Sequence, residues 1–443
     1  MRPPRSALVL LGLLLWGSVG AAAHAQNRAP APRPRTPASV MSFRGAEWLE
    51  RPQRVAEEMP EGVLETMRLA PGDVVADLGA GSGYFTRRMA PLVAPSGTVF
   101  AVDVQPEMLE MLVENAEADG LTGIVPVLGD ADDPKLPAGE IDWILLVDVY
   151  HELADPGAML ARMSESLAPT GRVALVEYRV EDGSGDHIRA EHRMSVRQVV
   201  AEWEAAGFRL VELHEFLPSQ HLFVLRREGG AGPAVQPVLA HYDLADALRD
   251  GRVEVTAAGT GDDAVTLAIR RTGREAMVVT LPAGATFEAS GEAGDMIARR
   301  DGFALLGEDG AQTWRVPARR AHHEAARVPG PADRLEVRVD GEGSQVRDLM
   351  WLFQGVDVNP AVAPTVEQIA VWIVTDDLGW DPLSAHARAS SVHAANAVAL
   401  AAAYVNGAGI DIRQKRIWAE RERFVPALTD DGLKRIFAEL EGN

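Results

Sequence analysis

The chain has 443 residues, of which 47% are hydrophobic, so its length favours two or three domains with conventional cores. Acidic residues outnumber basic ones by 64 to 43, which gives a formal net charge of -21. Such a surface repels phosphate backbones and argues against a nucleic-acid partner. The chain has no cysteine, which excludes disulfides, thiolate metal sites, a lipidated cysteine anchor and cysteine nucleophiles.

The N-terminus has the pattern of an export signal. Two arginines form a basic start, residues 7–20 are apolar, and Ala23-His24-Ala25 is a small-x-small cleavage pattern. The apolar run is shorter than the roughly 20 residues of a membrane span. We therefore expect a signal peptide at 1–25, a proline-rich linker at 26–42, and export to a bacterial periplasm. The alternative is an inner-membrane anchor formed by an uncleaved signal; no later membrane span is expected.

Residues 43–228 predict a doubly wound α/β fold, because strand and helix patterns alternate. The central strands are nearly continuous apolar runs, typical of parallel strands covered on both faces, and the last two predict an antiparallel pair at the sheet edge. The expected strands are 74–78, 99–102, 124–127, 141–147, 172–177, 209–214 and 222–226. The expected helices are 85–93, 106–118, 156–167 and 196–205.

A glycine-rich loop follows the first of these strands in VVADLGAGSGYFT, residues 74–86. Its three alternating glycines remove side chains where a ligand must approach the backbone, and they permit dihedrals that other residues avoid. Tyr84 stands where a dinucleotide fingerprint would need glycine. Asp77 at the base of the loop suits a cationic or zwitterionic ligand better than a pyrophosphate.

Further acids follow the next two strands. Asp103 is placed to accept two hydrogen bonds from a ribose diol, and Asp130 is placed to receive an exocyclic amine. Each acid alone is more often a helix cap or a turn residue. Together, each at the carboxyl end of a strand, they favour a nucleoside ligand.

These motifs, from about Pro60 to Arg227, resemble the class I S-adenosylmethionine-dependent methyltransferases. The resemblance implies a seven-stranded Rossmann-like sheet with its last strand antiparallel, and S-adenosylmethionine as the methyl donor. In this family the glycine loop holds the methionine part, the first acid after it holds the ribose and the second contacts the adenine. The implied cofactor-binding residues are Asp77, Gly79, Gly81, Gly83, Asp103, Val104, Asp130, Ala131 and Asp148.

Methyl transfer from a sulfonium is an in-line displacement with a neutral leaving group, so alignment and water exclusion matter most. The expected acceptor is a small molecule that attacks through oxygen, nitrogen or carbon. His151 is the candidate base, because it follows the fourth strand and titrates in a useful range, and Tyr150 is a second catalytic candidate. The alternative is that His151 only hydrogen-bonds its loop. Glu177 ends the fifth strand and is a candidate for lining the acceptor pocket.

Two other segments are candidates for parts of the site. In DHIRAEHRMS, residues 186–195, a helix would bring His187 and Glu191 to one face; we predict an acceptor-side lid there and no metal site, since a third ligand is missing. Trp48 either belongs to an N-terminal lid helix or, as favoured, docks onto the sheet.

A second class of function stays open: the protein could be an exported binding or scaffold protein that keeps the methyltransferase fold without catalysis.

The remaining sequence changes character after a Gly/Pro-rich boundary. Residues 238–342 are rich in short β segments, which predicts a small sandwich or barrel, and residues 343–443 are mainly helical. A protein or glycan partner is expected for this part. Asp376, Asp377 and Asp381 are predicted to form a solvated turn, with calcium binding as the alternative.

Overall fold

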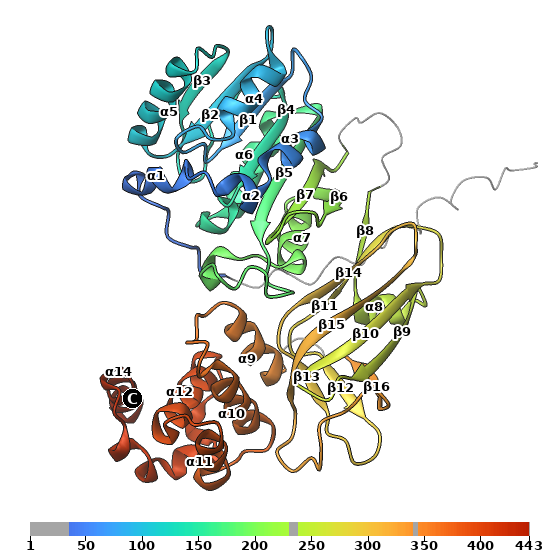
Figure 1. The fold of residues 1–443 in the computed structure, drawn as a ribbon, viewed down its shortest axis with the longest axis vertical. Coiled ribbons are helices and arrows are strands. Elements are labelled where there is room, and N and C mark those ends of the chain that lie inside the picture. Colours follow the sequence, from blue (N-terminus) through green and yellow to red (C-terminus); the bar gives the residue numbers. More distant parts are fainter. Residues whose placement is uncertain (1–34, 230–237, 340–343, 443) are drawn as a thin grey trace, which may run out of the picture.

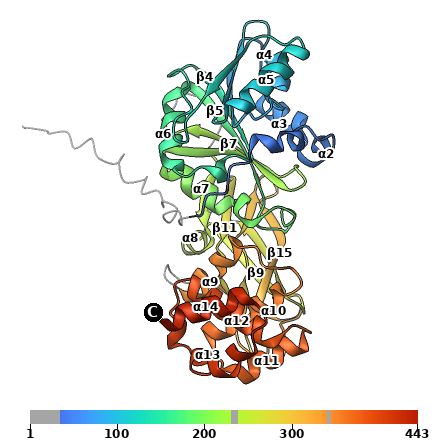
Figure 2. The same ribbon diagram turned by 90° about the vertical axis from the view of Figure 1, so that its left-hand side faces the viewer.

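The computed structural model describes residues 35–229, 238–339 and 344–442, which form three parts. An α/β part comes first, a β-rich part follows, and a helical part ends the chain (Figure 1). In Figure 2 the α/β part lies at one end of the molecule, the helical part lies at the other end, and the β-rich part lies between them. The expected export signal lies outside the described residues. Within these described ranges, none of the helices has both the length and the apolar character needed to cross a bilayer.

The α/β part is built on one seven-stranded sheet of order β3-β2-β1-β4-β5-β7-β6. All neighbours are parallel except β7, which runs antiparallel to both β5 and β6, so the predicted fold class is confirmed. The strands are β1 (Val74–Leu78), β2 (Thr98–Asp103), β3 (Ile124–Leu128), β4 (Ile141–Val147), β5 (Leu167–Tyr178), β6 (Phe208–His214) and β7 (Gln220–Arg227).

Helices cover both faces of this sheet because alternate residues of the central strands enter different cores. In β4, Ile144 and Leu146 join one buried cluster, while Leu145 joins the other. Proline at the first turn begins α3, α5 and α6, and the Ser195 side chain caps α7. The helices are α1 (Ala46–Leu49), α2 (Arg54–Glu58), α3 (Pro60–Met67), α4 (Thr86–Val93), α5 (Pro106–Ala118), α6 (Pro156–Ser166) and α7 (Val196–Ala205), with 3-10 turns η1 (Phe43–Gly45), η2 (Tyr150–Glu152) and η3 (Ala190–His192).

The β-rich part contains a closed barrel, of order β10-β15-β13-β12-β16-β9, and a three-stranded sheet of order β14-β11-β8. Leu267, Phe287 and Val316 lie in its main buried cluster. Of the two predicted architectures, sandwich and barrel, the structure has the barrel. Its elements are β8 (Ala240–Asp243), α8 (Leu244–Arg249), β9 (Val253–Gly259), β10 (Ala264–Arg271), β11 (Met277–Leu281), β12 (Thr286–Ala289), β13 (Met296–Ala298), β14 (Gly302–Leu306), β15 (Ala311–Arg320) and β16 (Arg334–Arg338).

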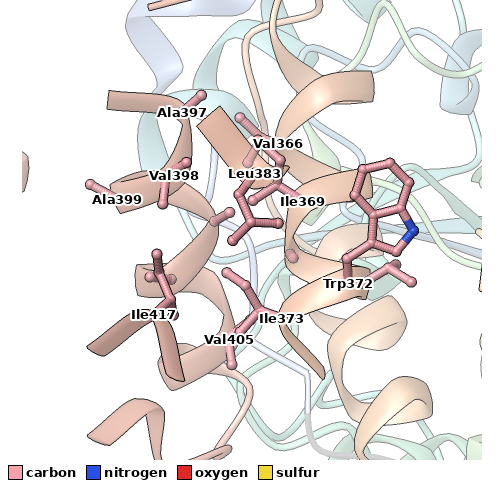
Figure 3. Packing of buried hydrophobic residues seen from close by; sticks show 14 of the residues in the cluster. Val366, Ile369, Trp372, Ile373, Leu383, Ala397, Val398, Ala399, Val405 and Ile417 are labelled. Atoms are coloured by element: carbon pink, nitrogen blue, oxygen red, sulfur yellow. The ribbon is translucent and has the colours of Figure 1, made fainter. Parts of the chain in front are cut away.

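The helical part packs around the apolar helix α10. Ile369 and Ile373 of α10 face the alanine-rich α12, whose small side chains allow a close approach, and Leu383 fills the space beside them (Figure 3). Trp372 is fully buried against the same core. The elements are α9 (Gln345–Gln354), α10 (Ala363–Thr375), α11 (Trp380–Ala389), α12 (Ala394–Gly407), η4 (Ile412–Gln414), α13 (Arg416–Ala419), η5 (Arg421–Arg423), η6 (Val425–Ala427) and α14 (Asp431–Gly442).

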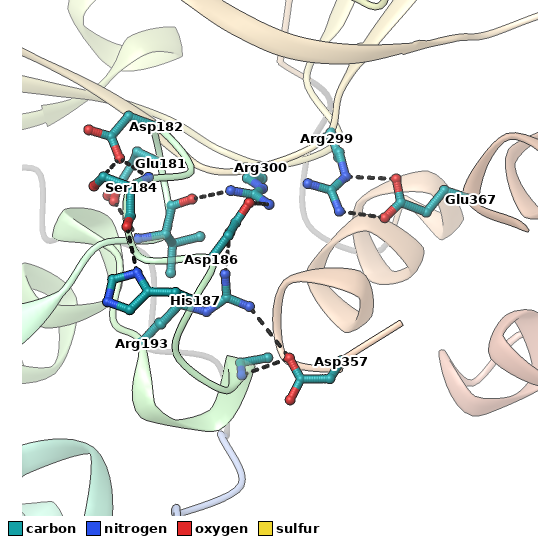
Figure 4. Close-up of polar contacts among 12 residues, drawn as sticks. Glu181, Asp182, Ser184, Asp186, His187, Arg193, Arg299, Arg300, Asp357 and Glu367 are labelled. Atoms are coloured by element: carbon teal, nitrogen blue, oxygen red, sulfur yellow. Dashed lines mark hydrogen bonds and ion pairs between the residues drawn. The ribbon is translucent and has the colours of Figure 1, made fainter. Parts of the chain in front are cut away.

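Buried ion pairs join the three parts (Figure 4). Glu367 of α10 accepts hydrogen bonds from Arg299 and Arg319 of the β-rich part, with oxygen–nitrogen distances of 2.6 to 3.1 Å. Arg300 reaches the α/β part and donates to the Val180 carbonyl at 3.0 Å. The segment after β5 is therefore held by the β-rich part.

The acids 376, 377 and 381 of the helical part do not converge on one point. Asp376 accepts a hydrogen bond from the His323 backbone, Asp377 accepts one from the Arg416 backbone, and Asp381 pairs with Arg423. Each acid already has a partner, which favours the predicted turn over a calcium site.

Candidate active site

The glycine loop between β1 and α4 has backbone angles that favour glycine. Gly79, Gly81 and Gly83 have φ angles of 79°, 54° and 88°, in the left-handed region that favours glycine. A Cβ atom at Gly79 would lie 2.3 Å from a methyl group of Val149, the residue that follows β4 by two positions. Glycine at position 79 is therefore needed for the loop to sit beside the carboxyl end of β4.

Two buried carboxylates flank this loop. Asp77 accepts a 2.6 Å hydrogen bond from the Thr86 hydroxyl, and burial raises its pKa from 3.8 to about 6. Asp103 accepts backbone hydrogen bonds from Gly81 and Gln105, each at 2.9 Å, while burial raises its pKa. Both carboxylates are thus fixed in place, and their negative charge is only partly offset.

The ends of β2 and β3 present an apolar surface next to Asp103. Val104 is 45% exposed and Leu128 is 48% exposed, so two large apolar side chains are open to solvent beside the Asp103 carboxylate. Asp130 and Ala131 follow β3 and are also exposed, and Asp130 pairs with Lys135 at 3.0 Å. A planar nucleobase fits such a surface, since it needs apolar contact on its faces and a polar partner at its edge.

The N-terminal segment with α1 and α2 lies over the glycine loop. The Glu50 carboxylate accepts a 2.6 Å hydrogen bond from the Ser82 hydroxyl, and the Arg54 guanidinium lies over the Tyr84 ring. Trp48 itself is 47% exposed and stacks with Arg51, so the expected docking of Trp48 onto the sheet is wrong. The short helix α1 leaves its ring on the outer side, and the helices rather than that ring cover the loop.

Asp148 stands at the carboxyl end of β4 with a left-handed φ of 55°. Both its carboxylate oxygens accept from the Gln220 side-chain amide, at 2.9 and 2.8 Å. Desolvation, followed by the negative charges of Glu58 and Glu177, raises the pKa of Asp148 well above 3.8. The buried Gln220 Oε1 atom has no hydrogen-bond partner.

These features fit S-adenosylmethionine, whose sulfonium and ammonium groups are cationic. The glycines expose the backbone, and the partly uncompensated acids Asp77 and Asp148 favour positive charge. Each Asp103 oxygen accepts one backbone hydrogen bond and keeps a further lone pair with which a carboxylate can accept from a ribose hydroxyl. The structure thus brings the predicted residues from β1, β2 and β4 to one edge of the sheet, with those of β3 beside them.

His151 lies next to this edge in η2 and is fixed by Glu177 of β5. The His151 Nδ1 atom is 2.6 Å from Glu177 Oε2, and both side chains are buried. Burial lowers the pKa of His151, but the charge and hydrogen bond of Glu177, together with the charges of Asp148 and Glu152, outweigh it and raise the pKa above 6.5. Since a carboxylate only accepts hydrogen bonds, Nδ1 carries a proton and Nε2 is left for another partner.

Tyr150, the second catalytic candidate, does not lie beside His151 at this edge of the sheet. Its hydroxyl donates a 2.6 Å hydrogen bond to Glu202 of α7, and its ring is buried with Trp203 in the sheet core. Consecutive residues of the 3-10 turn point in different directions, so the structure assigns Tyr150 to packing and only His151 to the site edge.

The sequence places His192 only in the predicted acceptor-side lid segment and does not predict its contact with His151. Residues 183–189 contain no helix, and Ala190–His192 forms only a 3-10 turn. The helix that would have brought His187 and Glu191 to one face is therefore not formed. His187 instead contacts the Ser184 carbonyl, while His192 Nδ1 lies 3.0 Å from His151 Nε2. No sequence spacing signals a contact between residues in separate loops.

Comparisons with known proteins agree with this geometry. Residues 75–171 match a family model described as a methyltransferase domain. A protein-L-isoaspartate O-methyltransferase of Aeropyrum pernix is 32% identical over 143 residues, covering 30% of this chain and 52% of that protein. Nocamycin O-methyltransferase of Saccharothrix syringae is 32% identical over 113 residues, covering 26% of this chain and 40% of that protein.

A third relative is a ubiquinone/menaquinone biosynthesis C-methyltransferase of Teredinibacter turnerae, 29% identical over 116 residues, 26% of this chain and 47% of that protein. A solved S-adenosylmethionine-dependent methyltransferase from Aquifex aeolicus is 25% identical, with a TM-score of 0.39, and covers 42% of this chain and 98% of that one. The chain spans about half or less of the length of these curated relatives. Residues 75–171 of the α/β part thus match the methyltransferase domain family, and this similarity supports S-adenosylmethionine as the methyl donor.

Proposed function

We propose that this protein transfers the methyl group of S-adenosylmethionine to an oxygen, nitrogen or carbon atom of a small-molecule acceptor. The reaction is an in-line displacement: the acceptor atom forms a bond to the methyl carbon, the sulfur–carbon bond breaks, and a neutral thioether leaves. The enzyme mainly has to align the reactants and exclude water, for which orientation alone supplies a large effect.

One observation carries this proposal: the glycine loop and Asp103 are joined by a direct hydrogen bond. The Gly81 backbone nitrogen donates to Asp103 Oδ2 at 2.9 Å, so the residues for the methionine part and for the ribose of the cofactor are set in one arrangement. A domain that had lost cofactor binding would have no need to keep this buried carboxylate, whose desolvation is unfavourable.

The acceptor side is assigned to the neighbourhood of His151. Nε2 is the ring nitrogen that Glu177 does not contact, and it lies 3.0 Å from His192 Nδ1, so we place acceptor activation at this pair of imidazoles. A cavity of about 730 Å³ lies beside this region, between the α/β part and the helical part. It is lined by Glu191 and Met194 on one side and by Trp351 and Leu352 on the other, and its size suits a small molecule.

Titration calorimetry and product analysis test this function together. The wild type is expected to bind S-adenosylmethionine and to form S-adenosylhomocysteine with members of a panel of phenols, amines and quinols. Asp103→Ala should abolish binding, while Glu117→Ala, which removes an exposed acid of α5, should bind like the wild type. Absence of binding in the wild type would refute the proposal. Binding without turnover on any acceptor would favour the silent scaffold.

Export to a bacterial periplasm is part of the same proposal and is supported by the sequence pattern of residues 1–25. Cell fractionation should recover the protein in the periplasm, with a mature N-terminus near Gln26. Recovery from the cytosol with residue 1 intact would refute export, and recovery in the membrane fraction with residue 1 intact would support the anchored alternative.

A further inference from the structure

We infer that His151, Glu152 and His192 form a binding site for one divalent transition-metal ion at the acceptor side of the cofactor site. These three residues each offer one ligand atom, and the three atoms lie within 4.8 Å of one another. The cluster combines two imidazoles and one carboxylate, and it comes from two separate turns, η2 and η3.

The orientation of His151 supports a metal ligand. Glu177 fixes Nδ1 at 2.6 Å, which leaves the lone pair of Nε2 directed toward His192. Histidines that bind metals almost always donate their other ring N–H to such a partner, because this sets the tautomer and the ring direction. The buried Glu177 carboxylate thus supplies the supporting contact that a metal site requires.

The position of His192 also suits a ligand better than a packing role. Its Nδ1 atom lies 3.0 Å from His151 Nε2, with the two rings nearly perpendicular. A single hydrogen bond would account for this contact alone. It would not account for Glu152, which brings a carboxylate oxygen within 4.8 Å of a ring nitrogen of both histidines, and whose Oε1 atom accepts a 3.3 Å hydrogen bond from the Met41 backbone.

The two C-terminal parts of the chain hold the segment that carries His192. Asp357, which follows α9, accepts a 3.0 Å hydrogen bond from the Ala190 backbone and lies 3.8 Å from the Arg193 guanidinium (Figure 4). Arg300 of the β-rich part binds the Val180 carbonyl and Asp186 of the same segment. The C-terminal half therefore has a positioning role: it fixes one ligand of the site.

The ligand set indicates which ions bind. Imidazole nitrogens suit zinc and other late first-row metals, whereas magnesium and calcium prefer oxygen ligands. Three protein ligands leave coordination positions open for an acceptor atom, as in catalytic rather than structural sites. A bound cation would lower the pKa of an acceptor hydroxyl, whose proton leaves to water, and this use of the ion rests on the proposed function. His151 is then a ligand, in place of the base predicted from the sequence.

Metal binding is measured directly on the full-length protein with Zn²⁺ as the probe. After chelator treatment, calorimetry and metal analysis should show one Zn²⁺ per chain and no comparable binding of Mg²⁺. His192→Ala should weaken Zn²⁺ binding by more than 100-fold, and Glu177→Gln, which removes the supporting charge but keeps the shape, by about 10- to 100-fold. Asp357→Asn should weaken it to a smaller extent, because it loosens only the segment.

His187→Ala is the matched control, since His187 is an exposed histidine of the same segment and should leave Zn²⁺ affinity unchanged. A wild type that binds no stoichiometric Zn²⁺ would overturn the inference. So would equal Zn²⁺ affinity in the wild type and in folded His192→Ala or Glu177→Gln variants, checked by near-ultraviolet circular dichroism. Intact S-adenosylmethionine binding with no Zn²⁺ binding would refute the metal site alone, and the reverse result would refute the proposed methyl transfer alone.

Discussion

Replacing Asp77 by asparagine should stabilise the ligand-free protein while weakening its affinity for S-adenosylmethionine. Asp77 is buried and its pKa is raised from 3.8 to about 6, mainly by desolvation. A raised carboxylate pKa means that the folded state loses stability as the pH rises above the unfolded value of 3.8, and that the full loss is present above about 6. At about 1.4 kcal/mol per pKa unit, this amounts to about 3 kcal/mol at pH 7.5 and about 1 kcal/mol at pH 4.5.

Asparagine keeps the shape of Asp77 and an oxygen that accepts from Thr86, but it carries no charge. Urea unfolding at pH 7.5 and 4.5 should therefore show a larger gain in the free energy of unfolding at the higher pH, with about 3 kcal/mol as the upper value. Calorimetry should show weaker S-adenosylmethionine binding, because the variant lacks a negative charge near the cationic ligand. Glu117→Gln, an exposed acid, should change neither quantity. A variant that is less stable at pH 7.5 and binds the cofactor as tightly as the wild type would refute this reasoning.

Three further changes probe the framework around the site. His221 is buried between two glutamates, whose charges and hydrogen bonds outweigh desolvation and raise its pKa to about 9. The protonated ring therefore stabilises the fold at pH 6.5, and this stabilisation is lost as the pH rises through 9. The free energy of unfolding of the wild type should fall by about 3 kcal/mol over that window, and that of His221→Gln should not. Glu367→Gln removes the carboxylate that Arg299 and Arg319 share, leaving Arg319 paired with Asp263, and should lower the free energy of unfolding by about 3 kcal/mol, visible as a lower urea midpoint. Gly79→Ala places a Cβ atom 2.3 Å from a Val149 methyl group and should reduce both the free energy of unfolding and the affinity for the cofactor. Adding Val149→Ala should restore part of the stability. A Gly79→Ala variant as stable as the wild type would contradict the loop geometry.

The sequence predicted the central sheet closely because its signals are local. The bounds of β1, β4 and α5 agree with the expected 74–78, 141–147 and 106–118, since apolar runs and an initial proline define them. β5 begins at Leu167 rather than 172, because residue 167 already pairs with Ile141 of β4. That pairing is a tertiary contact, and no local pattern in the preceding residues announces it.

The acceptor side could be predicted only in part. His151 was identified from its place after a strand, but its partner Glu177 was assigned only to the acceptor pocket, and His192 was assigned to a lid segment. These three residues lie in different elements and meet only after the sheet has formed. The segment that carries His192 also owes its position to Arg300 and Asp357, more than 100 residues later in the chain.

The most direct measurement is a crystal structure of the protein with S-adenosylhomocysteine. The expected result is density for the nucleoside between the glycine loop and the end of β2, with the ribose hydroxyls about 3 Å from the Asp103 carboxylate. Well-ordered crystals in which this position stays empty at saturating ligand, or in which the ligand lies elsewhere, would contradict the assignment of the cofactor site.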